Sequence, residues 1–303
     1  MNPLLAVPNV SEGRDHPGVV AIAAAFTSGG GVRLLDVHRD ADHHRAVVTL
    51  AGGPGELAQA LMRGTAEALQ RIDIGDGRDR SRETLAPGER PRFGQHPHVG
   101  AVDVVPVVHL TAAQRGAACA EALVAAEEIG ALGVPVFLYG ELAGSRTRAE
   151  LRRGGIKALA ARMLAGELRP DFGPSAPHPT GGAALVGARP PLVAFNLELA
   201  PPATVEDARR IAALIREGGE HGLPGVRAIG VALQRGPQVS LNIERPTEVP
   251  LRTVVSAVRA HAAVARAELV GLAPAAALEG FPADVPLPGF DPVRHLIENA
   301  LKL

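Results

Sequence analysis

Apolar positions recur along this chain with two different periods, one typical of strands and one typical of helices. Short runs rich in Val and Leu are separated by longer segments in which apolar residues return every three or four positions. In the first half, the pattern predicts strands over residues 4–7, 32–37, 46–50, 99–110 and 134–139. It predicts helices over residues 21–26, 56–72, 112–129 and 147–164.

The second half shows the same two periods. The predicted strands cover residues 192–199, 226–234, 238–244 and 267–271, and the predicted helices cover residues 205–216 and 250–264. Gly236-Pro237 lies between two of these strands and favours a hairpin turn. Two short helices are predicted to close the chain, one near Ala275 and one over residues 292–301.

The order strand, helix, strand, strand, helix, strand is that of the split βαβ or ferredoxin-like unit. Residues 4–110 follow the same order, and a helix and a strand are then added. The predicted fold class is therefore α/β (α+β), with two ferredoxin-like α/β sandwich subdomains that each carry helices on one face. We expect the open faces of the two sheets to meet and to enclose a cleft or tunnel.

Two segments interrupt the regular pattern. Residues 168–182 are rich in Pro and Gly and poor in apolar residues, which indicates a linker or a ligand-binding loop. We place the domain boundary inside this segment, with an N-terminal subdomain over residues 1–178 and a C-terminal subdomain over residues 179–303. Residues 75–92 are polar, charged and without period, and predict a mobile loop.

Composition narrows the classes of function. Hydrophobic residues make up 46% of the 303 positions, which is typical of a folded chain rather than a disordered one. The formal net charge is −1 and no basic block occurs, so a nucleic-acid partner is not expected. Seven Phe, one Tyr and no Trp also leave few rings on which single-stranded bases can stack.

The chain shows no sign of secretion or of membrane insertion. The first residues lack the charged start and apolar run of a signal peptide, and no segment approaches the roughly 20 apolar residues that span a bilayer. Cys119 is the only cysteine, so no intramolecular disulfide can form, which fits a reducing compartment. We therefore expect a cytoplasmic protein without a membrane partner.

The stretch from Arg92 to Asp103 holds the first candidate for chemistry. His96 and His98 flank a proline, and apolar strand residues follow at once. Proline disfavours helical backbone in the residue before it, so His96 is expected on an extended or turn backbone just before a strand. A side chain on a loop against a rigid sheet is well placed for catalysis. A polar turn whose histidines only meet water is the alternative.

A second polar cluster runs from His38 to Arg45. It leaves three interpretations open: a metal site, a solvated hairpin turn, and a pocket for an anion with Arg45 as the carboxylate partner. The first of these would draw its ligands from His38, Asp40, Asp42, His43 and His44. The spacing matches no established metal motif, so no metal is assigned. Both polar clusters are expected to meet at one end of the first sheet.

Histidine titrates near neutral pH, so one imidazole can accept a proton and return it. No Ser-His-Asp or Cys-His arrangement is apparent, because Ser11 lacks a nucleophile-elbow context and Cys119 lies in a predicted helix. General acid–base catalysis by His96 is therefore preferred to covalent catalysis. The glycines at 181, 182 and 187 lack the lysine and the spacing of a phosphate-binding loop.

Six segments of the chain form one recognisable set. They are Val7-Pro8-Asn9-Val10-Ser11-Glu12-Gly13, Leu34-Leu35-Asp36-Val37, Gln95-His96-Pro97-His98-Val99-Gly100-Ala101-Val102-Asp103, Pro135-Val136-Phe137-Leu138-Tyr139-Gly140-Glu141, Pro170-Asp171-Phe172-Gly173-Pro174, and Gly187-Ala188-Arg189 through Ala194-Phe195-Asn196. In this order they resemble the glutamate formimidoyltransferase (formiminotransferase) family, including the transferase part of formiminotransferase-cyclodeaminase. The resemblance runs, with gaps, from about position 3 to the C-terminus.

The resemblance implies transfer of a formimidoyl group from N-formimidoyl-L-glutamate to N5 of tetrahydrofolate, in histidine degradation and one-carbon metabolism. It implies tetrahydrofolate as co-substrate, a homodimer, and His96 as the catalytic acid and base. The family's folate-binding segment falls on Gly173, Pro174, Ser175, Ala176, Pro177, His178, Pro179, Thr180, Gly181 and Gly182. From charge and position, candidate residues for binding the other substrate are Asn9, His38, Asp40, His44 and Arg45, while Arg189 is a second candidate partner for a carboxylate.

Other functions remain open at this stage. Gln95 and His98 differ from the family's usual residues beside the catalytic histidine, which leaves open a formyl donor, or a different amine donor or acceptor. A non-catalytic folate-binding protein and a metal-dependent hydrolase are the alternatives from other classes.

Overall fold

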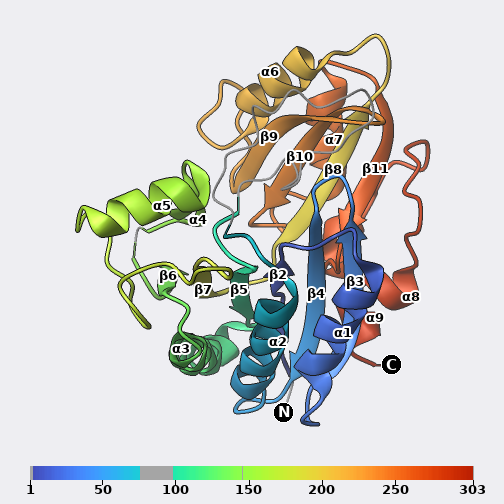
Figure 1. The fold of residues 1–303 in the computed structure, drawn as a ribbon. Coiled ribbons are helices and arrows are strands. Elements are labelled where there is room, and N and C mark those ends of the chain that lie inside the picture. The colour runs from blue at the N-terminus through green and yellow to red at the C-terminus, as the bar shows by residue number, and fades with distance from the viewer. Residues whose placement is uncertain (1–2, 76–97, 145, 303) are drawn as a thin grey trace. The chain divides into compact units, whose positions relative to one another are not determined.

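The computed structural model of the protein describes residues 3–75, 98–144 and 146–302, and the predicted loop over 75–92 lies outside these ranges except for Gly75. The chain forms two compact units, Met1–Pro190 and Pro191–Leu303 (Figure 1). The predicted boundary after residue 178 was placed too early. Residues 184–189 form a strand in the middle of the first sheet, so they belong to the first unit.

In its described residues, the first unit contains a sheet of seven strands and the helices that pack on it. In chain order its elements are β1 (Leu4–Ala6), β2 (Asn9–Val10), α1 (His16–Thr27), β3 (Arg33–Asp40), β4 (Arg45–Gly52), α2 (Leu57–Arg71), β5 (Val102–Val108), the 3₁₀ helix η2 (Ala112–Gln114), α3 (Arg115–Ala131), β6 (Val136–Gly140), α4 (Arg148–Arg152), α5 (Gly155–Leu164) and β7 (Ala184–Arg189).

The strand order confirms the ferredoxin-like prediction for residues 4–108. Strands β1 and β2 run one after the other between β4 and β5, with antiparallel pairing on both sides, and β3 pairs with β4 at the edge. Two further strands then extend the sheet. Strand β7 pairs in parallel with β5 on one side and with β6 on the other. The predicted addition of one helix and one strand was therefore incomplete.

Strand β7 was missed because its sequence, Ala-Leu-Val-Gly-Ala-Arg, is short and follows two glycines. It is a parallel central strand whose first five residues are buried. Strands of this kind are buried on both faces, so they lack the alternation that marks a strand with one face in water.

Helices cover both faces of the added part of the sheet, which corrects the prediction of helices on one face only. Helices α1, α2 and α3 share one apolar core with the sheet. Helices α4 and α5 supply Leu151, Leu159 and Met163 to a separate core on strands β5, β6 and β7. The segment predicted as one helix over residues 147–164 is two helices, because Gly154 and Gly155 take positive φ angles of 76° and 67°.

The second unit is a four-stranded antiparallel sheet with helices on one face. Its elements are β8 (Val193–Leu199), α6 (Val205–Ile215), β9 (Val226–Leu233), β10 (Gly236–Ile243), α7 (Leu251–Arg259), β11 (Val264–Val270), the 3₁₀ helix η3 (Ala275–Leu278), α8 (Pro292–His295) and α9 (Ile297–Ala300). The strand order β11-β8-β10-β9 is that of the ferredoxin-like unit and confirms the predicted order.

Alternation in the strands explains which face the helices cover. In β8, Val193, Phe195 and Leu197 are fully buried and join the core formed with α6 and α7. Asn196 and Glu198 alternate with these apolar residues and lie on the opposite face, because successive strand residues point to opposite sides. Among the described residues, no helix combines the length and the apolar character that are needed to cross a membrane.

Close packing between α1 and α2 requires a glycine. A Cβ atom added at Gly64 would lie 2.1 Å from Cδ1 of the fully buried Phe26. We predict that Gly64→Ala lowers the free energy of unfolding, because overpacking costs about 1–3 kcal/mol and exceeds the roughly 1 kcal/mol that alanine gains in helix propensity. Urea unfolding of both proteins measures the difference.

Gly116 in α3 is the matched control, since a Cβ atom there would meet nothing within 4 Å. The unfolding free energy of Gly116→Ala is expected to equal or exceed that of the parent protein. Equal stability of the Gly64→Ala protein and the parent would show that the two helices are not in the close contact described here.

Candidate functional site

The loop between β2 and α1 is anchored to the start of β5. The Ser11 N–H donates to the carbonyl oxygen of Ala101 at 2.8 Å, and the Ser11 hydroxyl donates to the carbonyl oxygen of Gly100 at 2.7 Å. The Glu12 carboxylate accepts the N–H groups of Arg14 and Asp15 at 2.6 and 2.9 Å. Ser11 is therefore a buried structural residue, which agrees with its dismissal as a nucleophile.

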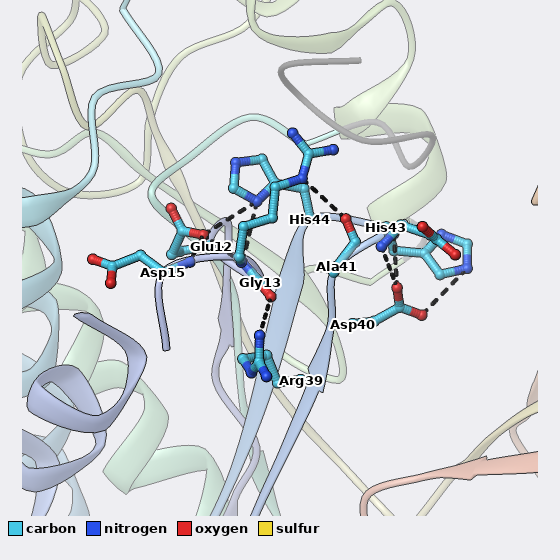
Figure 2. A network of polar contacts seen from close by, with 10 residues as sticks. Glu12, Gly13, Asp15, Arg39, Asp40, Ala41, His43 and His44 are labelled. Atoms are coloured by element: carbon cyan, nitrogen blue, oxygen red, sulfur yellow. Dashed lines mark hydrogen bonds and ion pairs between the residues drawn. The ribbon is translucent and has the colours of Figure 1, made fainter. Parts of the chain in front are cut away.

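The hairpin between β3 and β4 packs directly on this loop (Figure 2). Arg14 Nε donates to the carbonyl oxygen of Ala41 at 3.0 Å, and Arg39 donates to the carbonyl oxygen of Gly13 at 3.0 Å. A Cβ atom at Gly13 would lie 2.1 Å from the carbonyl oxygen of Asp40, so this close approach requires glycine. The sequence predicted that the hairpin would instead meet the stretch around His96 and His98, and His96 lies outside the described residues, so that meeting stays a prediction.

His44 is held between the loop and the hairpin. Its backbone has a φ angle of 49°, a left-handed conformation that is uncommon for residues other than glycine. Its Nδ1 atom accepts the Gly13 N–H at 3.2 Å and lies 3.3 Å from the Glu12 carboxylate (Figure 2). Burial lowers the pKa of His44; Glu12 opposes this effect, while Arg14 and His98 add to it. The imidazole is therefore held neutral, with a lone pair on Nδ1.

Asp40 shapes the tip of the hairpin. One carboxylate oxygen accepts the N–H groups of Asp42 and His43 at 2.8 and 2.9 Å. The other lies 3.8 Å from Nε2 of His43, whose side chain is almost fully buried. The cluster is therefore a hairpin turn, as one of the three interpretations had it, but it is partly buried, and His43 is its buried residue. Within the described ranges, no group of three or more His, Cys, Asp or Glu side chains is arranged to hold a metal ion.

Arg45 begins β4 beside a buried carboxylate. Asp103 on β5 accepts the Val99 N–H at 2.7 Å with one oxygen and forms an ion pair with Arg152 of α4 through the other. Burial, followed by repulsion from Arg152, lowers the pKa of Arg45 to about 10, and Asp103 and Asp40 partly offset this shift. Arg45 thus stays cationic at neutral pH.

A cleft of about 280 Å³ opens where this loop meets the end of α2. It is lined by Ser11, Glu12, His44, Arg71, Ile72, Asp73 and Ile74. Its walls combine the carboxylates of Glu12 and Asp73 with the imidazole of His44 and the cationic Arg71, which pairs with Glu67. The two carboxylates can accept hydrogen bonds from a cationic or N–H-bearing group.

The Pro- and Gly-rich segment is not a linker between the units, because it lies in the first unit and packs on both sides of the cleft. The carbonyl oxygen of Thr180 accepts the Ile74 N–H at 2.8 Å, and that of Gly181 accepts the Ala101 N–H at 2.9 Å. His178 accepts the Gly181 N–H on Nδ1 at 2.9 Å, which closes the turn. Gly182, at φ 68°, lies so close to the Val99 carbonyl oxygen that no side chain fits.

The remaining candidate residues lie at different positions in the first unit. Asn9 donates to the carbonyl oxygen of Val7, and Arg189 donates to that of Pro190 at the end of β7. His38 lies on β3 opposite Val47. Gly187 lies inside β7 and not in a phosphate-binding loop, in agreement with the sequence analysis. His96 and Gln95 lie outside the described residues, so the position of His96 stays a prediction.

Cys119 lies on α3 with its sulfur 3.9 Å from the Glu141 carboxylate. Burial, with a further contribution from Glu141, raises the pKa of this thiol and keeps it protonated. This environment disfavours a nucleophilic role.

Sequence reasoning missed Glu12 and Arg152. Glu12 stands in the quoted Ser11–Gly13 motif, and its position just before a helix was an available signal. No local sequence pattern indicated a role for Arg152, because its contact with Asp103 joins residues that are far apart in the sequence.

Stability should depend on pH through His44. The unfolded chain binds a proton on this histidine near its ordinary pKa of about 6.5, whereas the folded protein, with a lowered pKa, releases it. The contribution of His44 to stability is therefore complete above that pH and is lost as the pH falls. We predict that His44→Asn, which tolerates the left-handed backbone, reduces the drop in urea midpoint between pH 7.5 and pH 5. An unchanged pH profile in the variant would contradict a neutral buried His44.

Comparison of the sequence with known proteins finds one matching family model and several related proteins. Residues 4–81 and 89–189 match the model of the formiminotransferase domain, N-terminal subdomain. The chain is 32% identical to a glutamate formimidoyltransferase from Streptococcus pyogenes serotype M1, over 97% of each chain. It is 31% identical to a glutamate formimidoyltransferase from Thermoplasma acidophilum, over 90% of this chain and 88% of that protein.

The chain also matches longer proteins. It is 36% identical to the formimidoyltransferase-cyclodeaminase of Sus scrofa, over 90% of this chain but only 50% of the porcine protein. The chain thus spans about half the length of these cyclodeaminase-bearing relatives.

Proposed function

The chain belongs to the formiminotransferase family, and on this basis we propose that it transfers a formimidoyl group from N-formimidoyl-L-glutamate to N5 of tetrahydrofolate. The observation that carries the proposal is the 32% identity to a protein named glutamate formimidoyltransferase over 97% of both chains. This enzyme would act in histidine degradation and one-carbon metabolism, with tetrahydrofolate as its co-substrate.

The chemistry asks for one group that can both accept and donate a proton. N5 of the folate attacks the amidinium carbon of the donor and forms a tetrahedral intermediate. N5 loses its proton and the glutamate nitrogen gains one, after which the bond between that nitrogen and the carbon breaks. His96 is proposed as the imidazole that moves this proton. Acid–base catalysis of this kind contributes typically about 10²–10⁴-fold to the rate.

The two substrates are assigned to two sets of residues. Residues 173–182 are proposed to bind the folate, an assignment supported by a backbone that His178 and the contacts with Ile74 and Ala101 hold in one conformation. Asn9, His38, Asp40, His44 and Arg45 are proposed to bind the donor. The neutral His44 and the Glu12 carboxylate in the cleft support a site for the cationic amidinium end of the donor.

The setting of the enzyme is proposed from sequence and family. The single cysteine supports a reducing compartment, and we propose the cytoplasm. A homodimer is proposed from the family resemblance, and analytical ultracentrifugation of the purified chain tests it.

The decisive experiment follows formation of formimidoyl-tetrahydrofolate when the protein is mixed with tetrahydrofolate and N-formimidoyl-L-glutamate. We predict turnover by the parent protein and a loss of about 10²–10⁴-fold in kcat for His96→Ala, because no other group then moves the proton. Folate affinity, measured by fluorescence titration, should change little.

His16→Ala serves as control, since His16 is exposed at the start of α1 and should leave turnover unchanged. Tight folate binding without turnover of this donor would remove the proposed activity. Full turnover by the His96→Ala protein would instead leave the activity standing and remove the assignment of the residue.

A further inference from the structure

Two arginines of α4 face the sheet in the first unit. Arg148 and Arg152 are four residues apart and so lie on the same side of the helix. The Arg148 guanidinium carbon lies 5.7 Å from the centre of the Tyr139 ring, which positions it by a cation–π contact. Arg152 pairs with Asp103, and its side chain is only 13% exposed. Helix α4 thus holds two cations over strands β5 and β6.

Arg45 adds a third cation near this region: it precedes Ala46, which pairs with Val10 of β2, and Val10 pairs with Val102 of β5, the residue before Asp103. The charges of Arg148 and Arg152 both act on its guanidinium. The backbone of Arg45 pairs with Asp40 in the sheet, but its guanidinium makes no hydrogen bond or ion pair with the described residues. Asp103 is occupied by Arg152 and the Val99 N–H. Asp40 is occupied by the backbone N–H groups of the hairpin. Three arginines therefore face two aspartates that are already engaged.

Such an arrangement is costly unless an anion joins it. Like charges held close together at a partly buried site repel one another, and an unpaired guanidinium loses hydration without gaining a partner. The Tyr139 hydroxyl adds a second unused group: the residue is 4% exposed, and the hydroxyl has no hydrogen-bond partner among the described residues. Gly187 leaves room for this ring, since a Cβ atom there would lie 2.9 Å from it. The region has the chemistry of a preformed carboxylate site.

We propose that Arg45, Arg148 and Arg152 form a carboxylate-binding subsite that takes a carboxylate of the glutamate part of the formimidoyl donor. The inference deepens the proposed function and rests on it. The guanidinium fork matches a carboxylate in a bidentate way, and the excess positive charge supplies the counter-charge. Arg45 directly follows His44 at the end of the hairpin, so the subsite and the cleft lie at the same end of the sheet. The glutamate tail of the folate has the same chemistry and is the competing occupant.

Arg148→Gln is the sharpest test, because Arg148 makes no ion pair among the described residues and its loss should leave the fold intact. The KM for N-formimidoyl-L-glutamate should rise about 10- to 100-fold, as expected for a lost hydrogen bond to a charged group. The kcat and the KM for tetrahydrofolate should change little. Arg148→Lys keeps the positive charge but lacks the paired N–H groups of the guanidinium. It should therefore recover part of the lost donor affinity.

Arg153→Gln is the matched control, since Arg153 is the next exposed arginine, at the C-terminal end of α4. It should behave as the parent protein. Direct binding of L-glutamate, followed by calorimetry, gives a second measurement that needs no turnover, and Arg148→Gln should weaken it by a similar factor.

The outcomes separate the subsite from the activity. A parent protein that turns over, with an unchanged donor KM in Arg148→Gln, overturns the subsite and leaves the proposed function standing. A rise in the KM for tetrahydrofolate alone, absent with a folate lacking its glutamate tail, overturns the donor assignment in favour of the folate. Binding of L-glutamate that depends on Arg148, without any formimidoyl transfer, supports the subsite and removes the proposed function.

Discussion

The buried carboxylate of Asp103 organises the described part of the first unit around the site. One of its oxygens accepts the Val99 N–H and the other pairs with Arg152, so it joins the segment entering β5 to helix α4. A carboxylate that is 2% exposed is stable only when its oxygens are satisfied by charge and hydrogen bonds. The hydrogen bond comes from Val99, four residues before Asp103, and the counter-charge comes from the distant Arg152. Removing Arg152 would leave a buried charge without its partner, which ties the fold of α4 to the chemistry of the site.

Around this carboxylate, backbone contacts hold the polar loops in place. Gly13 lets the first loop touch the hairpin, and Gly182 lets the Pro- and Gly-rich segment touch the start of β5. Each position leaves no room for a Cβ atom, so the loops approach at backbone distance and bond through N–H and carbonyl groups. Rigid loops cost little entropy when a substrate binds. The segment that looked like a linker is therefore a fixed wall of the first unit.

Local sequence pattern predicted most elements because period and turn residues act over a few positions. The ferredoxin-like order of the second unit follows directly from alternation in β8 and β10 and from the helical period between them. Strand β7 was not predicted because it is short, parallel and buried on both faces. For the candidate site, the sequence located the polar hairpin residues but not their contacts. The contact between the hairpin and the first loop, and the Arg152–Asp103 pair, depend on how distant segments pack, which no local pattern reveals.

Two neighbouring residues give the site opposite character at its two ends. His44 lies in a cleft that also presents Glu12, Asp73 and Arg71, and Arg71 pairs with Glu67, whereas Arg45 remains cationic. The proposed donor carries a cationic amidinium at one end and carboxylates at the other. In the proposed assignment the two carboxylates of the cleft face the amidinium and the arginines face the donor carboxylates. Reversing the donor would set its carboxylates against Glu12 and Asp73, so the proposed charge pattern favours one orientation over the other.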